Sequence, residues 1–335
     1  MDGPAAALAL DFGGTQVRAA VVRADGSRGP VARRRTPVED GAGAIVAACI
    51  ATLREALAGD QAAAGAVAAI AISAPGPVDP FAGLIVDPPN LGPTFHDVPI
   101  VALVEDALYL PAVLDRDTQV AALGEGRFGA AAGCRDYLYL TVSTGIGGAA
   151  VIDGRLLRGP DGTAGELGHL LVDRDGPPCG CGVAGHLEAF ASGSAIARAA
   201  RQAVERGESP HLAVLVRERG AAFGARDVAA AEEGGDPVAA RLMADARDAF
   251  AVACVTLADV FNPSLIVVGG GLAAGQGERL LGPARAAVAQ RAFRRAAARA
   301  RVVPAALGDD VGLVGGLVLV EERRVAGDGP PTAAR

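Results

Sequence analysis

Short apolar runs alternate along the chain with longer stretches in which apolar residues recur at helical spacing. Such short runs are typical of strands buried on both faces, and their alternation with helices predicts α/β lobes with largely buried sheets. Strands are expected at 8–10, 17–23, 67–73, 112–114, 137–142, 149–152, 265–268 and 301–305. Helices are expected at 43–57, 98–109, 118–128, 194–205, 237–261, 278–298 and 311–322.

One arrangement of elements occurs twice. Residues 8–26 read as a strand, a glycine loop, a returning strand and an Asp-Gly turn, and residues 137–154 repeat that order. An Asp-Gly pair beside apolar runs is a strong hairpin signal. We therefore predict an internal duplication, with one copy in each of two lobes.

The length and composition are compatible with two lobes. The chain has 335 residues, 51% of them hydrophobic, which is more than one small core requires. We expect an N-terminal lobe at 1–117, completed by a C-terminal helix at about 311–325, and a C-terminal lobe at 118–310. The Gly-, Pro- and Ala-rich segment 326–335 is expected to be a disordered tail.

Charge and residue usage exclude several classes of function. The sequence contains no lysine, so neither a Schiff-base lysine nor a phosphate-loop lysine is available. A net charge of −7 argues against a nucleic acid or an anionic membrane as partner. The first residues do not resemble a signal peptide, and five cysteines, an odd number, fit a reducing compartment. We expect a cytoplasmic homodimer with no nucleic-acid or membrane partner.

Three glycine loops follow buried strands and predict one repeated task, the binding of phosphate groups. Backbone N–H groups in such turns form anion-binding nests, and the missing side chains let phosphates approach closely. The loop residues are Asp11, Gly13, Gly14 and Thr15; Thr144, Gly145 and Gly147; and Gly269, Gly270 and Gly271. Asp11 would hold Mg²⁺ through water, and the two threonines would donate hydroxyl groups to phosphate oxygens. The alternative is that the loops are tight turns without a ligand.

Four metal-ligand side chains lie close together in another glycine-rich stretch. They are His169, Cys179, Cys181 and His186. Two thiolates and two imidazoles suit a closed, tetrahedral, structural Zn²⁺ site. The alternative is two surface histidines and two free thiols, because a Cys-x-Cys disulfide would be strained. The remaining cysteines, expected to be small core residues, are Cys49, Cys134 and Cys254.

Asp117 is the best candidate for a general base. Phosphoryl transfer to a hydroxyl group needs a carboxylate that can accept the proton of the alcohol. Asp117 lies between the expected strand at 112–114 and the helix that follows, at the mouth of the sheet. It would also suit the N-cap of that helix, and the two interpretations are compatible.

The chain resembles the ROK family over nearly its whole length. The motifs that carry the resemblance are Asp11-Phe-Gly-Gly-Thr15, Ser73-Ala-Pro-Gly-Pro-Val-Asp79, Asn90-Leu91, Asp117 with Ala121-Ala-Leu-Gly-Glu125, Ser143 to Gly148, Gly165-Glu-x-Gly-His169 and Cys179-x-Cys-Gly-x-x-Gly-His-x-Glu188. The family comprises bacterial sugar kinases and sugar-responsive repressors. The resemblance therefore implies a two-lobed actin-like (ribonuclease H-like) ATPase fold, with a zinc-bearing loop in the second lobe.

The resemblance also implies an activity, ATP- and Mg²⁺-dependent phosphorylation of a primary hydroxyl of a hexose bound between the lobes. Asp117 would take the proton from that hydroxyl group. The family's sugar contacts would fall on Gly76, Asn90, Glu166, His169 and Glu188. His169 would then serve twice, with one ring nitrogen on zinc and the other on a sugar hydroxyl.

The sequence departs from the family pattern in the expected sugar pocket. Arg116 stands where an asparagine is usual before the catalytic aspartate, and an arginine only donates hydrogen bonds. His186 replaces a third cysteine, Gln16 replaces a lysine, and the aromatic residue after Asn-Leu is displaced to Phe95. We expect Arg116 to point towards the acceptor or towards Asp115, and to narrow the choice of substrate.

Three functions within this resemblance stay open. The first is a glucokinase-like hexose kinase, and the second is a kinase of a C7 cyclitol or modified sugar. The third is a non-catalytic sugar-binding or regulatory ROK protein, although the retained Asp11 and Asp117 speak against it. A repressor would need a helix-turn-helix before the ATPase core, and only ten residues precede Asp11.

Overall fold

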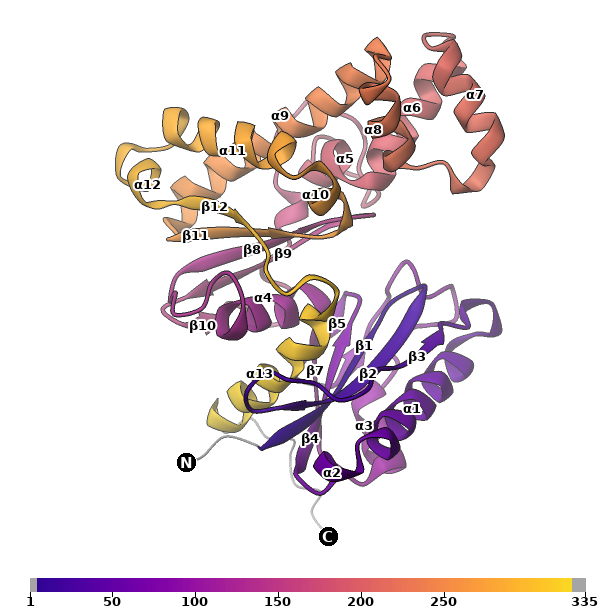
Figure 1. Ribbon diagram of the computed structural model, residues 1–335, viewed down its shortest axis with the longest axis vertical. Helices are drawn as coiled ribbons and strands as arrows, with labels where there is room; N and C mark the ends of the chain where they lie inside the picture. Colours follow the sequence, from indigo (N-terminus) through magenta and orange to yellow (C-terminus); the bar gives the residue numbers. More distant parts are fainter. Residues whose placement is uncertain (1–4, 327–335) are drawn as a thin grey trace. The chain divides into compact units, whose positions relative to one another are not determined.

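The computed structural model describes residues 5–326, which form two compact units (Figure 1). As far as they are described, the first unit comprises Met1–Gly133, Leu156–Ala164 and Ala306–Arg335. The second unit comprises Cys134–Arg155 and Gly165–Ala305. Each unit has its own sheet and its own cluster of buried apolar side chains.

The first unit is an α/β structure. Its strands are β1 (Ala6–Phe12), β2 (Gln16–Arg23), β3 (Ala32–Arg35), β4 (Val67–Ala74), β5 (Val78–Asp79), β6 (Leu84–Ile85) and β7 (Ala112–Arg116). Its helices are α1 (Ala42–Gly59), α2 (Gln61–Ala64), α3 (Ile100–Leu108), α4 (Asp117–Phe128) and α13 (Val311–Ala326), with 3₁₀ turns η1 (Val38–Asp40) and η4 (Gly308–Asp310).

The second unit has the same two kinds of element. Its strands are β8 (Tyr137–Val142), β9 (Ile146–Ile152), β11 (Leu265–Gly269) and β12 (Arg301–Pro304), and β10 (Arg155–Leu156) spans the boundary. Its helices are α5 (Leu187–Ala191), α6 (Gly193–Glu205), α7 (Pro210–Arg219), α8 (Ala225–Glu233), α9 (Pro237–Phe261), α10 (Gly271–Gln276), α11 (Glu278–Arg291) and α12 (Arg294–Arg299), with 3₁₀ turns η2 (Leu167–His169) and η3 (Gly220–Ala222).

The order of strands in the first sheet is β3-β2-β1-β4-β7. The β1–β2 and β2–β3 pairs are antiparallel, whereas β1, β4 and β7 run parallel. In the parallel part, Asp11 is in register with Ser73, and Ser73 with Asp115. Because the carboxyl ends of parallel strands meet at one edge, this register brings three polar side chains together at the ends of otherwise apolar strands.

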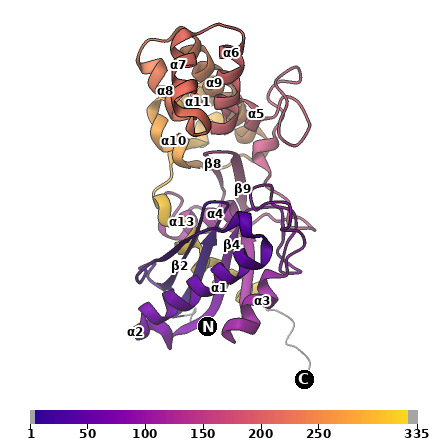
Figure 2. The ribbon, with the colours of Figure 1, turned by 90° about the vertical axis from the view of Figure 1, so that its right-hand side faces the viewer.

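The second sheet, in the order β10-β9-β8-β11-β12, repeats the design. The β8–β9 hairpin is antiparallel, and β8, β11 and β12 run parallel. The predicted duplication of strand, glycine loop and returning strand is therefore confirmed. Helices α6, α8 and α9 pack against one another beside this sheet (Figure 2).

Helix α1 is, by length and composition alone, long and apolar enough to cross a membrane. Its buried residues include Ile45, Cys49 and Leu53, and the helix packs against β1, β2 and β3. One face of the helix is thus buried against the sheet, and its length and composition are weak evidence for a membrane span.

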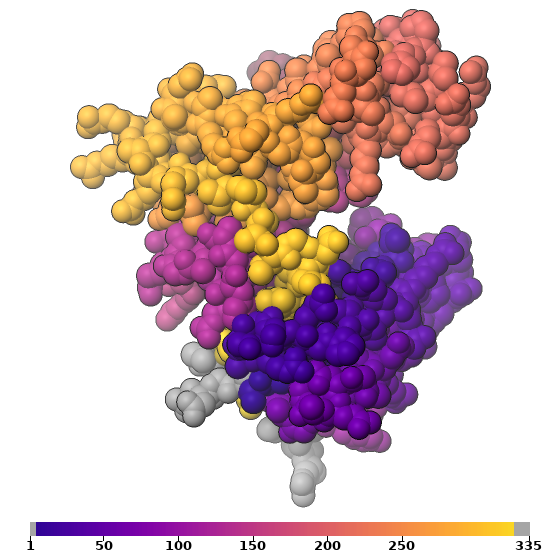
Figure 3. All heavy atoms as spheres, viewed as in Figure 1, coloured from indigo at the N-terminus to yellow at the C-terminus, as the bar shows by residue number. Residues whose placement is uncertain are grey.

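The predicted lobe boundary at 117/118 is wrong, because α4 belongs to the first unit. It packs closely on α13, where a Cβ atom at Gly315 would lie 2.0 Å from the backbone oxygen of Val120, and one at Gly124 would lie 3.1 Å from Gly315 Cα. The first unit accordingly continues to Gly133 and includes Leu156–Ala164. Figure 3 shows the C-terminal part of the chain, in yellow, against the N-terminal part, in indigo, and α13 contacts β1 and β2.

Several elements differ from those predicted. Helices α7 and α8 and strand β3 were not expected, and the helix predicted at 278–298 is divided between α11 and α12. The break occurs at Ala292, whose backbone is extended, and Asp259 Oδ1 accepts a hydrogen bond of 2.6 Å from the Phe293 N–H. Of the predicted tail at 326–335, Ala326 is the last residue of α13, and 327–335 lie outside the described residues.

Candidate active site and metal centre

Asp11 is held at the end of β1 by two side chains. The guanidinium group of Arg18, on the returning strand β2, forms an ion pair with Asp11 Oδ2, and Ser73 Oγ donates to Asp11 Oδ1 at 3.0 Å. A Cβ atom at Gly312 would lie 2.6 Å from Asp11 Cγ, so the first turn of α13 contacts the carboxylate directly. The carboxylate is thus fixed in position, with its side chain 16% exposed.

The first glycine loop lies beside Asn90. The Gly13 N–H donates to the Gln16 oxygen at 3.1 Å, and a Cβ atom at Gly14 would lie 2.5 Å from the backbone oxygen of Asn90. This approach requires glycine at position 14. A pocket of about 460 Å³ opens there, lined by Gly14, Thr15, Arg35, Thr36, Pro37, Val38, Glu39, Asp40 and Asn90.

Asp117 is the first residue of α4, and Arg116 is its N-cap residue. The suggestion that Asp117 is itself the N-cap is therefore wrong, because the backbone is still extended at Arg116 and becomes helical one residue later. Asp117 Oδ1 accepts a hydrogen bond of 2.6 Å from the Thr118 N–H. The carboxylate thus stands at the amino end of a helix, where the helix dipole favours a negative charge.

Asp115, two residues earlier, is fully buried and uses both carboxylate oxygens. Oδ1 accepts the Arg116 N–H at 2.9 Å, and Oδ2 accepts Arg158 Nε at 2.8 Å. Arg158 also donates to Glu322, on α13, at 2.5 Å. Burial raises the pKa of the Asp115 carboxyl group, and the charge of Arg158 acts in the opposite direction. Arg158 therefore pairs with Asp115 through its side chain, and Arg116 contacts Asp115 through its backbone N–H.

Arg116 is buried, with 4% of its surface exposed. Its Nη2 donates to the backbone oxygen of Ala164 at 2.5 Å, and Gln119 Nε2 donates to the same oxygen at 3.3 Å. A Cβ atom at Gly76 would lie 2.9 Å from Arg116 Cδ. Gly76, one of the predicted sugar contacts, thus lies directly against the aliphatic part of Arg116.

In the second unit, Glu188 supports the β8–β9 glycine loop. Its Oε2 accepts the Ile146 N–H at 2.8 Å and would lie 2.8 Å from a Cβ atom at Gly145. On the other side of the loop, Ser194 Oγ donates to the Thr144 oxygen at 2.7 Å. Gly147 lies within β9 itself, paired with Thr141. The loop is therefore held by the starts of α5 and α6.

The third glycine loop differs from the other two because a short helix, α10, follows it. Gly269 ends β11, and Gly271 is the first residue of α10. Gly270, between them, has a φ of 94°, and a Cβ atom there would lie 2.5 Å from the Val142 oxygen. Only glycine satisfies both constraints at position 270.

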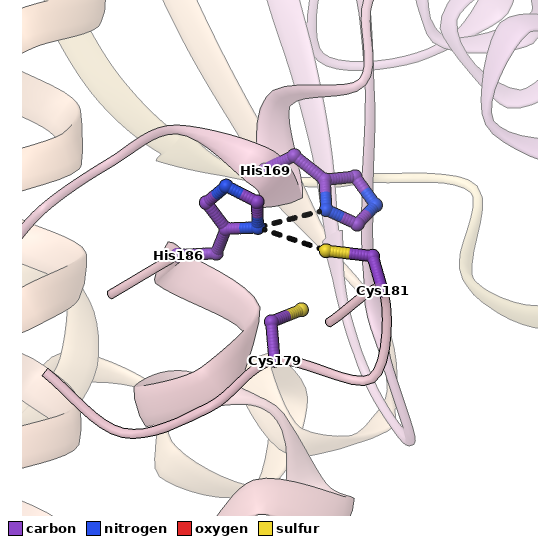
Figure 4. Close-up of side chains that lie close together, drawn as sticks. All are labelled: His169, Cys179, Cys181 and His186. Carbon is purple, nitrogen blue, oxygen red and sulfur yellow. Dashed lines mark hydrogen bonds between the residues drawn. The ribbon is translucent and has the colours of Figure 1, made fainter. Parts of the chain in front are cut away.

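The four predicted metal ligands converge (Figure 4). One ligand atom from each of His169, Cys179, Cys181 and His186 lies within 4.8 Å of all the others. His186 Nδ1 is 3.1 Å from His169 Nδ1 and 3.3 Å from Cys181 Sγ, and both cysteines are free thiols. Around one tetrahedral zinc ion, neighbouring ligand atoms lie about 3–4 Å apart, so this donor set fits Zn²⁺.

The Cys/His cluster adjoins Glu188. Cys179 Sγ lies 3.9 Å from Glu188 Oε1, while the other oxygen of Glu188 bonds the glycine loop. Glu166, another predicted sugar contact, immediately precedes η2, which ends at His169. A metal bound here would therefore fix the segments that carry Glu166, His169 and Glu188.

Sequence reasoning missed Arg158 and Glu322. The available signal was Asp115, since a carboxylate at the end of a buried strand needs a counter-charge. The sequence does not say which arginine supplies it. Sequence reasoning also missed Glu125, which is fully buried and accepts the N–H groups of Ala130, Ala306 and Leu307.

The sequence model of the ROK family matches residues 7–323. The chain belongs to the ROK family. Among curated relatives, a glucokinase of Halalkalibacterium halodurans is 33% identical over 318 residues, which are 94% of this chain and 95% of that protein.

Two solved ROK structures resemble the chain closely. A ROK hexokinase from Thermus thermophilus has a TM-score of 0.79 and 34% identity and covers 96% of this chain and 99% of its own. A ROK family glucokinase from Streptomyces griseus, in complex with glucose and AMPPNP, has a TM-score of 0.72 and 35% identity over 94% of this chain and 98% of its own. The predicted α/β fold of the actin-like kinases is confirmed.

Proposed function

We propose that this ROK protein transfers the γ-phosphoryl group of ATP to a primary hydroxyl group of a hexose, as a glucokinase does. The observation that supports this proposal most strongly is that glucokinases match this chain over nearly the full length of both sequences. The chain is therefore an ATP-dependent sugar kinase. The finer assignment, glucose or a related hexose as acceptor, rests on the same relatives. We expect the enzyme to act in the cytoplasm as a homodimer.

We propose Asp117 as the general base. The helix dipole at the start of α4 favours the ionised carboxylate, which is the form able to accept the proton of the sugar hydroxyl. The Thr118 N–H donates a hydrogen bond to Oδ1 of this carboxylate and helps to fix its orientation. Arg116, Gly76 and Asn90 in the first unit, and Glu166, His169 and Glu188 in the second, are the proposed acceptor contacts.

The three glycine loops are proposed to hold the nucleotide. N–H groups around Gly13 to Thr15, Thr144 to Gly147 and Gly269 to Gly271 would face phosphate oxygens, and the hydroxyl groups of Thr15 and Thr144 would add donors. Asp11 is the proposed Mg²⁺-binding carboxylate, oriented by Arg18 and Ser73. A bound Mg²⁺ would neutralise charge that develops on the transferred phosphoryl group.

We propose that His169, Cys179, Cys181 and His186 hold a structural Zn²⁺. The donor set supports this proposal because two thiolates and two imidazoles leave no ligand position open. The ion would stabilise the loop without taking part in phosphoryl transfer.

One observation favours a second acceptor class, a C7 cyclitol or modified sugar. Arg116 takes the place of an asparagine beside the proposed base, and it is buried rather than a solvated surface residue. A charged donor in place of an amide changes the hydrogen bonds that an acceptor must offer.

A panel of hexoses, amino sugars and cyclitols in a coupled ADP-release assay tests the proposal. We expect ATP-dependent turnover with glucose or a close relative. We expect Asp117→Asn to lose about 10²–10⁴-fold in kcat, because an amide keeps the shape of the carboxylate but cannot accept a proton. An unchanged kcat in this variant would place the base elsewhere, and no turnover with any hexose would favour the second acceptor class.

A further inference from the structure

The Leu156–Ala164 segment contacts the Asp115–Gln119 turn, which carries the proposed base, at two points. At one, Arg158 Nε donates to the fully buried Asp115 at 2.8 Å. At the other, the Ala164 oxygen accepts hydrogen bonds from Arg116 at 2.5 Å and from Gln119 at 3.3 Å. All these residues belong to the first unit.

The two contact points are themselves joined. The Ala164 N–H donates to the backbone oxygen of Arg158 at 2.9 Å, which closes the segment into a loop. Arg158 is anchored further by Glu322 on α13, at 2.5 Å, and its side chain is 13% exposed. One arginine therefore connects the end of β7, the C-terminal helix and the loop that holds Arg116 and Gln119.

The contacts of Asp115 link Arg158 to the position of Asp117. It accepts the Arg116 N–H at 2.9 Å, at the point where the chain passes from strand to helix. A fully buried carboxylate without a counter-charge takes up a proton, and its hydrogen bonds then change. Arg158 thus fixes the turn whose next residue is the proposed base.

We propose that Arg158 is a positioning residue for phosphoryl transfer. It touches neither of the reacting groups, and it holds the Asp115–Gln119 turn so that the Asp117 carboxylate meets the acceptor hydroxyl in a productive geometry. This inference rests on the proposed role of Asp117. A displacement of a catalytic group by about 1 Å can cost on the order of 10²-fold in rate.

The test compares kinetics and stability in four variants with ATP and the best acceptor of the panel. Arg158→Met removes the charge and keeps the volume, Arg158→Lys keeps the charge, and Asp115→Asn/Arg158→Met removes both charges. Arg23→Met is the matched control, because Arg23 pairs with another buried carboxylate of the first unit, Asp60, at 2.5 Å. We measure kcat, KM for ATP and the melting temperature.

We expect Arg158→Met to lower kcat about 10–100-fold, with KM for ATP within about twofold of wild type. Arg158→Lys should recover part of kcat. The double variant should regain melting temperature, since no unpaired charge remains buried, but kcat should stay low because the turn is still unanchored. Arg23→Met should lower the melting temperature without lowering kcat.

Two outcomes would overturn the proposal. One is a kcat within about twofold of wild type in Arg158→Met. The other is a kcat that recovers together with the melting temperature in the double variant, which would make the role of Arg158 purely structural. If Arg158→Met cannot be purified, Arg158→Lys and the double variant provide the same comparison.

Asp117→Asn distinguishes this proposal from the proposed role of Asp117. If Asp117→Asn keeps its kcat, the proposed base is wrong. If Asp117→Asn is inactive while Arg158→Met has a normal kcat, only the positioning role is wrong.

Discussion

At the scale of single residues, three consecutive side chains at the end of β7 have different environments. Asp115 is fully buried against Arg158, Arg116 is buried against Gly76 and the Ala164 oxygen, and Asp117 begins α4. The pleat of the strand turns successive side chains to opposite faces, and the helix then changes the direction again. The three adjacent residues can therefore serve the different roles proposed for them.

The proposed contact between Arg116 and the acceptor leads to a prediction about which acceptor the enzyme prefers. Replacing it by asparagine, Arg116→Asn, should raise kcat/KM for glucose relative to the best acceptor of the wild type by roughly 10-fold, as expected for one hydrogen bond of about 1–2 kcal/mol in a pocket. Measured kcat/KM values for the acceptor panel give the ranking. If wild type already prefers glucose and the ranking does not move in Arg116→Asn, the residue does not determine specificity.

The cysteines outside the proposed metal site differ in their burial. Burial raises the pKa of the Cys49 thiol and of the Cys254 thiol to about 12 in each case. Both thiols therefore stay protonated at neutral pH, and we assign them no chemistry. Cys134, also expected in the core, is only partly buried, and its thiol donates to the Asp136 oxygen at 3.4 Å.

At the scale of elements, the glycine-rich loop from Gly176 to Gly185 carries two of the four candidate metal ligands, Cys179 and Cys181. A Cβ atom at Gly185 would lie 1.7 Å from the Asp173 oxygen, and the φ of this residue is 81°. The loop is thus shaped by close backbone approaches and by four side chains that meet at one point.

Removal of the proposed metal should weaken binding of the acceptor sugar more than binding of the nucleotide. We expect about one equivalent of zinc in protein purified without chelator, and its loss in Cys179→Ala/Cys181→Ala. Because Glu188 and His169 lie in or beside the cluster, KM for the sugar should rise more than KM for ATP. Elemental analysis and two-substrate kinetics measure both effects, and full retention of zinc in the double variant would refute the ligand assignment.

The amino end of α9 gives a prediction about pH and stability. Asp236 is the N-cap, and its Oδ1 accepts the Val238 and Ala239 N–H groups, both at 2.9 Å. Burial acts to raise the pKa of Asp236, but the hydrogen bonds from Ser209 and from these two N–H groups outweigh it, so the pKa is lowered from 3.8. Asp236→Ala should therefore cost about 1–2 kcal/mol of unfolding free energy at neutral pH.

The sign of the pH effect follows from the lowered pKa. The stabilisation from the ionised carboxylate is complete above the unfolded value of 3.8 and is lost as the pH falls through the folded pKa. Asp236→Asn keeps a capping oxygen but has no charge to lose. Any advantage of wild type over Asp236→Asn in urea unfolding should therefore shrink below pH 3.8, and an advantage that grows with acid would contradict the assignment.

At the scale of the whole molecule, the first unit is assembled from distant parts of the chain. Helix α13 packs on β1, β4 and α4, and its buried residues include Leu313, Leu317 and Leu319. Burial of each such side chain contributes about 1.5–3 kcal/mol. The first unit therefore needs the end of the chain as well as its beginning.

The contact between α4 and α13 depends on small residues. A Cβ atom at Gly315 would lie 2.0 Å from the Val120 oxygen, so Gly315→Ala should force the two helices apart and cost about 1–3 kcal/mol or more. Gly43→Ala in α1 is the control, because its Cβ atom would have no neighbour within 4 Å. We expect this control to be neutral or slightly stabilising in thermal unfolding. Equal melting temperatures for the two variants would contradict the close packing.

The sequence alone predicted the features that depend on neighbouring residues. The apolar runs gave most of the strands of both sheets, and helix α9 was predicted with its observed bounds, Pro237–Phe261, because Asp236 and Pro237 mark its start. The convergence of the four candidate metal ligands was also predictable, since all four lie in one short stretch in which glycines allow close turns. The roles of the proposed site residues stay predictions until the kinetics are measured.

Tertiary structure decided the features that depend on residues far apart in the chain. Arg158 meets Asp115 across 43 positions and Glu322 across 164, and α4 joins the first unit because Gly124 lies against Gly315. Local patterns show that Asp115 needs a counter-charge and that α4 needs a surface to pack on. They do not identify the partner, because any arginine of this lysine-free chain and any small-residue helix face would satisfy the same local requirement, and only the packed fold selects one.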